Sequence, residues 1–136
     1  MVMLFDRFNL PEDIYEVVFA TKQQVIVAKL LIEMIKDNGG EIGKTEMSLF
    51  ATKLHDGNLI TDLIDEPPYK GKKVKVSYNK RQFYDRILTP MKSMGLIDYD
   101  LYKKTYRISD KFNKDLQHIG LQWIREMRKP SKSLVR

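Results

Sequence analysis

The side chains of this chain that could do chemistry are mostly cations, and they gather in one part of the sequence. Between Lys70 and Lys92 there are eight Lys and Arg residues and one acid, Asp85, so the local net charge is +7. Lys and Arg donate hydrogen bonds to phosphate and carboxylate groups, so this cluster suits an anionic partner. A solvated face or a flexible loop is the alternative interpretation of such a charge run.

The charge of the whole chain divides at residue 70. The 136 residues include 24 Lys and Arg and 18 Asp and Glu, for a net charge of +6. Residues 1–69 hold six basic and twelve acidic residues, whereas residues 70–136 hold eighteen basic and six acidic residues. We therefore expect the second half of the chain to meet a polyanion.

Other chemistry finds little support in the residue types. The chain has no cysteine, which excludes a disulfide framework and thiolate-ligated metals. His55 and His118 are far apart, and the acids Asp62, Asp65 and Glu66 lack the spacing of a metal-dependent nuclease. Since no nucleophile–base pair or glycine-rich phosphate loop is present either, we predict a protein that is not an enzyme and uses no metal or cofactor.

Hydropathy and length predict one domain over residues 1–136. No apolar run approaches the ~18 residues that a membrane span needs. Residues 1–10 carry Asp6 and Arg7 where a signal peptide would be apolar. Because 43% of the residues are apolar, the chain can build a core, and we expect a cytoplasmic protein without a membrane contact.

Hydrophobic spacing and breaker residues predict a mainly α fold with a small β-hairpin, of the α+β class. Asn9 and Pro11 suit the entry to a first helix, and Asn38-Gly39-Gly40 should end the second. Residues 59–64 suit another helical turn or two, Pro67-Pro68 should break it, and residues 69–76 suit a lysine-rich loop or a short strand. The expected elements are helices over 11–19, 21–37, 44–55, 80–94 and 110–129, a strand over 41–43, a hairpin over 96–108 and a flexible tail over 130–136.

The helix expected at residues 80–94 has a single apolar face. Pro90 lies inside it and should kink it or loosen the backbone hydrogen bond to Arg86, and Gly95 should end it. The residues expected to point inward are Phe83, Ile87, Leu88, Met91 and Met94.

The end of this helix and the segment that follows carry a family resemblance. Gly95-Leu96-Ile97 followed by Tyr106-Arg107-Ile108-Ser109 resembles a winged helix-turn-helix domain of the prokaryotic or archaeal regulator type. The resemblance covers residues 21–109 and leaves the two terminal helices outside it. The sequence departs from the family at residues 56–77, where about twenty residues replace the usual few between the second and third helices.

The resemblance implies a sequence-specific transcriptional regulator that binds double-stranded DNA. The helix at 80–94 would enter the major groove, and the wing at 96–108 would touch the backbone. The residue types agree, because Arg and Lys donate to guanine edges and a helix start favours a phosphate. Asp85 is expected to pair with Arg81. The expected DNA-binding residues are Lys72, Lys73, Lys75, Ser77, Asn79, Lys80, Arg81, Tyr84, Lys92, Lys103, Lys104 and Arg107, with packing against the core as the alternative for Tyr84.

The terminal helices predict a homodimer. Each has an apolar face that a three-helix core can cover only in part, although packing of both helices on their own core is the alternative. A two-fold dimer would present two reading helices to a pseudo-palindromic site. The expected interface residues are mainly Phe112, Leu116, Ile119, Trp123 and Met127.

Two other functions stay open at this point. The same cations could steer a protein-interaction module to an acidic partner. Binding of RNA or single-stranded DNA would use exposed aromatic residues for base stacking, for which Tyr69, Tyr78, Tyr99 and Tyr102 are available.

Overall fold

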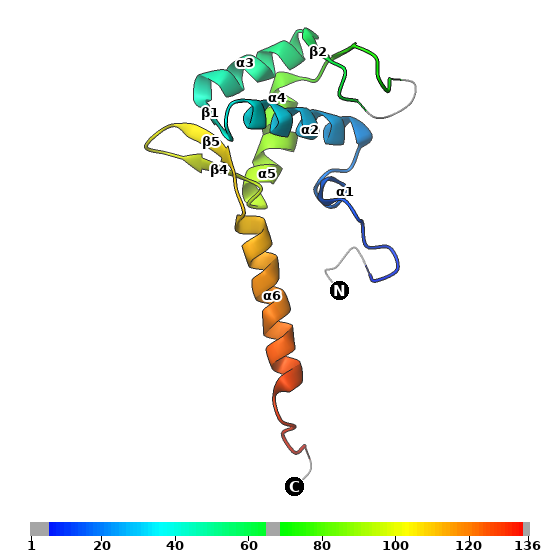
Figure 1. Ribbon diagram of the computed structural model, residues 1–136, viewed down its shortest axis with the longest axis vertical. Coiled ribbons are helices and arrows are strands. Elements are labelled where there is room, and N and C mark those ends of the chain that lie inside the picture. Colours follow the sequence, from blue (N-terminus) through cyan, green and yellow to red (C-terminus); the bar gives the residue numbers. More distant parts are fainter. Residues whose placement is uncertain (1–5, 65–68, 135–136) are drawn as a thin grey trace.

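The structure, a computed structural model, describes residues 6–64 and 69–134. It is an α+β fold with two small antiparallel sheets. Figure 1 shows α2 crossing the helix that contains α4, η1 and α5, while α6 leaves this core and extends away from it. The elements in chain order are α1 (Ile14–Val18), α2 (Lys22–Asp37), β1 (Glu41–Gly43), α3 (Lys44–His55), β2 (Leu59–Thr61), β3 (Val74–Val76), α4 (Lys80–Phe83), the π-helical turn η1 (Tyr84–Leu88), α5 (Thr89–Ser93), β4 (Ile97–Asp100), β5 (Thr105–Ile108) and α6 (Lys111–Arg128).

Helix α2 begins and ends at the expected residues. Thr21 and Gln24 form a capping box, in which each side chain accepts a hydrogen bond from the other residue's backbone amide. At the other end the amide of Gly40 donates to the carbonyl of Ile35 at 2.9 Å. Gly39 and Gly40 have φ angles of +80° and +90°, which favour glycine.

Two expected helical segments are different in the structure. The first helix begins only at Ile14, because the Asp13 side chain caps it, while Asn9 accepts a hydrogen bond from the Asp6 amide in a preceding turn. Residues 59–61 form β2 rather than a helical turn, since they pair with β3 from Leu59–Val76 to Thr61–Val74. That pairing joins residues more than a dozen positions apart, which local apolar spacing does not reveal. Pro67-Pro68 lies outside the described residues.

The expected hairpin is confirmed, and a third strand extends it into a three-stranded sheet. Strands β4 and β5 pair from Ile97–Ile108 to Asp100–Thr105, and β1 pairs with the other edge of β5. The sheet order is therefore β1-β5-β4, and the strand that follows α2 is joined to the hairpin. Residues 130–134 carry no helix or strand.

Residues 80–93 form one continuous helix with a widened turn in its middle. Pro90 has no amide hydrogen to donate to the carbonyl of Arg86. In the turn before it, the amide of Thr89 donates to the carbonyl of Tyr84, five residues back, as in a π-helix. Phe83, Ile87, Leu88 and Met91 are buried as expected, but Met94 is 39% exposed because it lies at the C-cap, beyond the last buried turn.

The two ends of the long connection between α3 and α4 lie close together in space. Pairing of β2 with β3 closes most of it into a ribbon, and the amide of Tyr78 donates to the carbonyl of Leu54 at 2.9 Å. The amide of Lys80 then donates to Nδ1 of His55 at 3.1 Å, and its ammonium group donates to Oγ1 of Thr52 at 3.0 Å. Although about twenty residues separate them in the sequence, the end of α3 and the start of α4 are therefore held side by side.

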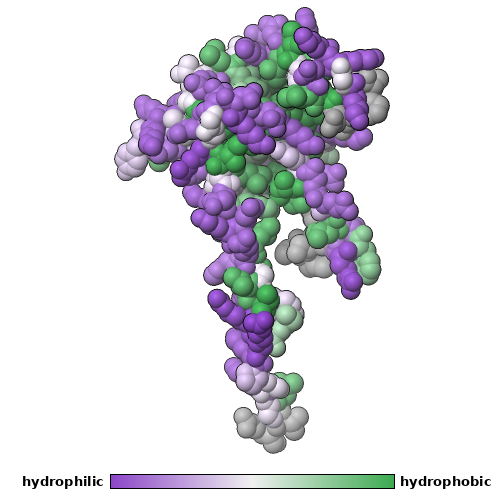
Figure 2. Space-filling view, in the orientation of Figure 1, coloured by the Kyte–Doolittle hydropathy of each residue, from purple (hydrophilic) through white to green (hydrophobic). Residues whose placement is uncertain are grey.

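The two terminal helices behave differently. Helix α1 packs on α2, and Asp13 lies 3.8 Å from the ammonium group of Lys29. No residue of α6 is buried, and Figure 2 shows apolar side chains along it, below the core. Of the five expected interface residues Phe112 is half-buried, while Leu116, Ile119, Trp123 and Met127 are exposed.

Gly95 joins the core to α6, and we predict that a Cβ there is costly. Its φ is +79°, and an added Cβ would lie 3.0 Å from the Phe112 amide nitrogen. Gly39→Ala is the matched control, because Gly39 has φ +80° and nothing within 4 Å. We expect Gly95→Ala to lower the free energy of unfolding by about 2 kcal/mol or more, and Gly39→Ala by about 1 kcal/mol. Equal losses in urea denaturation would contradict the close approach.

Candidate nucleic-acid interface

The helix at residues 80–93 has one buried and one exposed face. Its buried residues face α2 and α3, and the ring centroids of Phe83 and Phe50 are 5.6 Å apart. This burial turns a row of polar side chains to the outside at a spacing of three to four residues. We call this row the exposed stripe, and it consists of Arg81, Gln82, Asp85, Arg86, Thr89 and Ser93.

The exposed stripe contains both an expected and a missed cation. Arg81 lies 3.8 Å from Asp85, as expected, and both side chains are largely exposed. Arg86 was not among the expected DNA-binding residues, and neither was Gln82. Both follow from the helical spacing, since Gln82 and Arg86 are four residues apart on the side of the helix that Phe83, Ile87 and Met91 leave exposed.

The residues at the start of this helix are already engaged. The Asn79 side chain accepts from the Gln82 amide at 3.1 Å and caps the helix, while the carbonyl of Ser77 accepts from the Gln23 side chain at 3.2 Å. Lys80 is half-buried with its ammonium group on Thr52. Lys80, one of the expected DNA-binding residues, therefore joins α4 to α3 and does not belong to the exposed stripe.

Two further expected residues lie between the helix and its neighbours. Tyr84 is half-buried against the core, with its ring 5.4 Å from that of Phe83 in an edge-to-face arrangement. Lys92 is exposed, but its ammonium group lies 5.7 Å from the ring centroid of Tyr99 and 6.0 Å from that of Tyr106. This cation–π contact ties the end of the helix to the hairpin.

The hairpin carries an exposed basic tip. Lys103 and Lys104 are exposed, as is Tyr102 at 98%. The turn is held by Asp100, whose carboxylate accepts from the backbone amides of Tyr102 at 2.9 Å and Lys103 at 3.1 Å. Lys104 has φ +55°, and its carbonyl accepts from the Lys44 amide at 3.1 Å.

The base of the hairpin is a small ion-pair network. Asp98 accepts from Arg107 at 3.3 Å and from Lys111 at 3.0 Å, so it joins β4 to β5 and to the start of α6. Arg107, one of the expected DNA-binding residues, is therefore already paired with Asp98 within the protein.

The lysine-rich segment lies on the other side of the helix. Lys72 and Lys73 are exposed in the connection before β3. Lys75 is the cross-strand partner of Ile60, so both side chains lie on the exposed face of the β2–β3 ribbon. In Figure 1 this ribbon and the hairpin project to opposite sides of the α4–η1–α5 helix. The exposed stripe is therefore flanked by two basic projections.

Within residues 6–64 and 69–134, no group of three His, Cys, Asp or Glu side chains could hold a metal ion. The same part of the chain includes no helix long and apolar enough to cross a bilayer.

The acids of the hairpin predict its response to pH. Hydrogen bonds lower the pKa of Asp98, mainly the one from Lys111, and those from the amides of Lys103 and Tyr102 lower the pKa of Asp100. Because both pKa values are lower in the folded protein, the stabilisation is present above about pH 4 and is lost as the pH falls through the lowered values. We expect the protection of the β4 and β5 amides, measured against the exchange rate of an unfolded chain at the same pH, to fall on acidification. The Asp98→Asn, Asp100→Asn double variant should show a smaller loss of protection, and an unchanged response would contradict the assignment.

Comparison with models of known families, with curated proteins and with solved structures finds no match to this chain. The exposed stripe and the two basic projections that flank it are the features of the described residues that bear on function.

Proposed function

We propose that this protein is a sequence-specific binder of double-stranded DNA, most simply a transcriptional regulator, with a winged helix-turn-helix core and a homodimeric assembly. The exposed stripe would read base edges in the major groove, and the hairpin would touch the backbone as the wing. The observation that carries the proposal is the exposed stripe itself, which presents Arg81, Gln82 and Arg86 on a helix whose other face is buried.

The side chains of the stripe suit base recognition. Arg donates in a bidentate way to guanine, and Gln pairs in the same way with adenine. The basic tip of the hairpin and the exposed lysines of the other projection suit phosphate contacts, which supply affinity without sequence preference. Side chains that can read bases therefore lie on the helix, and cations that can bind phosphates lie beside it, as in a DNA-binding protein.

The order of the elements supports the winged-helix interpretation. Helix α2, strand β1, helix α3, the α4–η1–α5 helix and the β4–β5 hairpin follow one another as the resemblance implies. The inserted β2–β3 ribbon does not separate α3 from α4, because hydrogen bonds from Tyr78 and Lys80 hold the two helices together.

The exposed apolar face of α6 supports the homodimer. Leu116, Ile119, Trp123 and Met127 follow at steps of three and four residues, and each is more than half exposed. Such a stripe on an 18-residue helix is typical of a helix that pairs with another. A second copy is the simplest partner, since it offers the same face and doubles the number of reading helices.

One observation bears on the single-stranded alternative. Of the four tyrosines available for stacking, Tyr78 is buried and Tyr99 packs against Tyr106 with ring centroids 4.6 Å apart. Only Tyr69 and Tyr102 are exposed, and they belong to different projections. This pattern favours the duplex over a continuous stacking platform.

Binding to DNA should weaken steeply as salt is added. With roughly six phosphates contacted, the logarithm of the binding constant should fall with a slope of about −5 against the logarithm of salt concentration. Arg81→Ala or Arg86→Ala should cost about 1–3 kcal/mol on a selected duplex and relax its base preference, whereas Lys73→Ala should weaken all sequences equally. Fluorescence anisotropy with selected and scrambled duplexes measures both effects.

Two results would contradict sequence-specific DNA binding. No binding of any duplex at about 50 mM salt, where phosphate contacts are strong, would refute the proposal. If Arg86→Ala weakened binding to the selected and the scrambled duplex equally, the exposed stripe would have only a non-specific role.

The chain should assemble as a dimer in solution. The chain mass is 16.0 kDa, and we expect sedimentation at micromolar concentration to give twice this value. Trp123→Glu should give the monomer, because it places a charge in the middle of the apolar face. Leu121→Glu is the control, since Leu121 is 49% exposed but lies two residues from both Ile119 and Trp123, on another side of the helix. A monomeric native chain would end the dimer proposal.

A further inference from the structure

The middle of α6 is exposed and apolar along one side. Residues 116–124 include no Lys, Arg, Asp or Glu, and none of them is buried. On the apolar side Leu116 and Met127 form an outer pair and Ile119 and Trp123 form an inner pair, and each pair is nearly symmetric about the same midpoint. A face with this symmetry can cover itself when two copies run in opposite directions.

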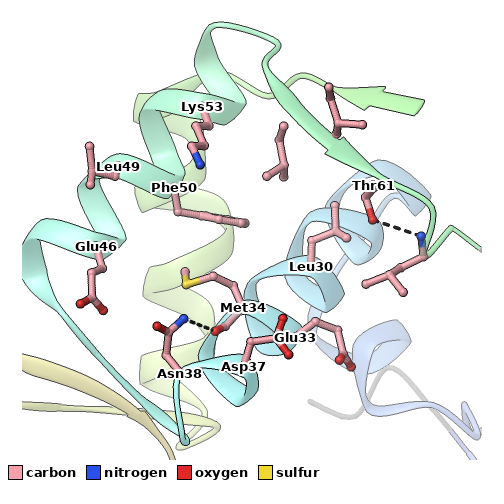
Figure 3. Close-up of a pocket in the computed structure, with 13 residues that line it drawn as sticks. Leu30, Glu33, Met34, Asp37, Asn38, Glu46, Leu49, Phe50, Lys53 and Thr61 are labelled. Carbon is pink, nitrogen blue, oxygen red and sulfur yellow. Dashed lines mark hydrogen bonds between the residues drawn. The ribbon is translucent and has the colours of Figure 1, made fainter. Parts of the chain in front are cut away.

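Another apolar surface, a hollow of about 330 Å³ between α2, α3 and β2, suits the pairing of two copies less well. Leu30, Met34 and Phe50 face this hollow, but Glu46 and Lys53 line it as well (Figure 3). Covering the hollow would therefore remove charged groups of both signs from water. The uncharged middle of α6 carries no such cost.

The two ends of α6 carry different charges. Residues 110–118 hold two Lys and two Asp, a net charge of zero, whereas residues 124–132 hold four cations and one Glu, a net charge of +3. A parallel pair would place the two +3 ends side by side and align the helix dipoles. An antiparallel pair places each +3 end beside the neutral end of the other copy and opposes the dipoles, so the charges favour the antiparallel pair.

One ion pair between copies suits the antiparallel arrangement. Asp115 and Lys129 lie seven residues before and seven after Gln122, on the same side of the apolar face. When two copies cross near Gln122 in opposite directions, Asp115 of one lies beside Lys129 of the other. Lys129 contacts Glu126 at 3.1 Å, and Asp115 has no ion-pair partner within the part of the chain that the structure describes. The Lys129 ammonium group can therefore bridge two carboxylates.

Gly120 also favours this arrangement. Glycine inside a helix lowers its stability relative to alanine, and an added Cβ at Gly120 would meet nothing within 4 Å, so its own chain does not require a glycine there. In an antiparallel pair Ile119 and Gly120 of one copy lie opposite Trp123 of the other, and the missing side chain leaves room for the indole ring. In a parallel pair the two Trp123 rings would meet in one layer.

We propose that two copies pair through α6 in an antiparallel orientation, with Trp123 of each copy packed on Ile119 and Gly120 of the other. This orientation rests on the homodimer proposed above and not on DNA binding. The two cores then lie at opposite ends of the helix pair. The length of α6, 18 residues or about 27 Å, therefore sets the spacing of the two exposed stripes and of the half-sites that they would read.

Pairs of nitroxide labels measure the orientation, because the native chain has no cysteine to label elsewhere. Lys114→Cys, Leu121→Cys and Arg128→Cys, made one at a time, place the label away from the apolar face at intervals of seven residues. In an antiparallel dimer, pulsed electron paramagnetic resonance should give similar distances at 114 and 128, each roughly 8 Å longer than at 121. Three equal distances, or a steady change from 114 to 128, would show a parallel pair and overturn the proposal.

A pair of variants tests the contact at Gly120. Gly120→Leu should raise the dissociation constant of the dimer at least tenfold in sedimentation, although Leu favours a helix, because its side chain fills the space of the Trp123 ring. His118→Leu is the control, since His118 is exposed on another side of α6 and should leave the constant unchanged. Equal effects of the two variants would overturn the Trp123 packing. A monomeric native chain would overturn the homodimer as well, whereas equal label distances within a dimer overturn the orientation alone.

Discussion

The burial of one face of the helix at residues 80–93 is the constraint on which the rest of the structure depends. Phe83, Ile87 and Met91 are almost fully buried in the common core, so the rotation of the helix about its axis is set by the core. That rotation determines which side chains reach solvent. Gln82 and Arg86 are exposed for the same reason that Phe83 and Ile87 are not.

A second constraint holds this helix at its start. Hydrogen bonds from Tyr78 and Lys80 to the end of α3 replace the short turn that would otherwise join the two helices. The ribbon between them can therefore project from the core without moving α4. The hairpin contacts this helix through Lys92 and Tyr99, and the ion pairs of Asp98 join the two hairpin strands to each other and to α6. The helix thus lies between two basic projections.

The division of charge along the sequence is only partly a division in space. Residues 1–69 supply α1, α2 and α3, but α2 and α3 together hold five Lys and three acidic residues, so these two helices do not form an acidic surface. The basic second half supplies the exposed stripe, the hairpin and α6.

The sequence predicted well those elements whose start or end is set by a few neighbouring residues. Asn38-Gly39-Gly40 and Gly95 each act within a few residues, and α2 and α5 end there as expected. The β2–β3 ribbon was missed as a pair because its stability comes from distant partners, and the first helix was drawn too long because Asp13, not Asn9, caps it. Lys80 and Tyr84 were expected in the binding surface because sequence spacing does not show that Thr52 and Phe83 contact them.

The most direct measurement is a titration of the labelled chain with a selected duplex of about 20 base pairs, followed through every backbone amide. We expect the largest resonance changes at Gln82 and Arg86, smaller ones at Lys73 and Lys103, and none around Asp37. Changes centred on Asp37 and its neighbours in α2, or spread evenly over the molecule, would contradict DNA binding through the exposed stripe.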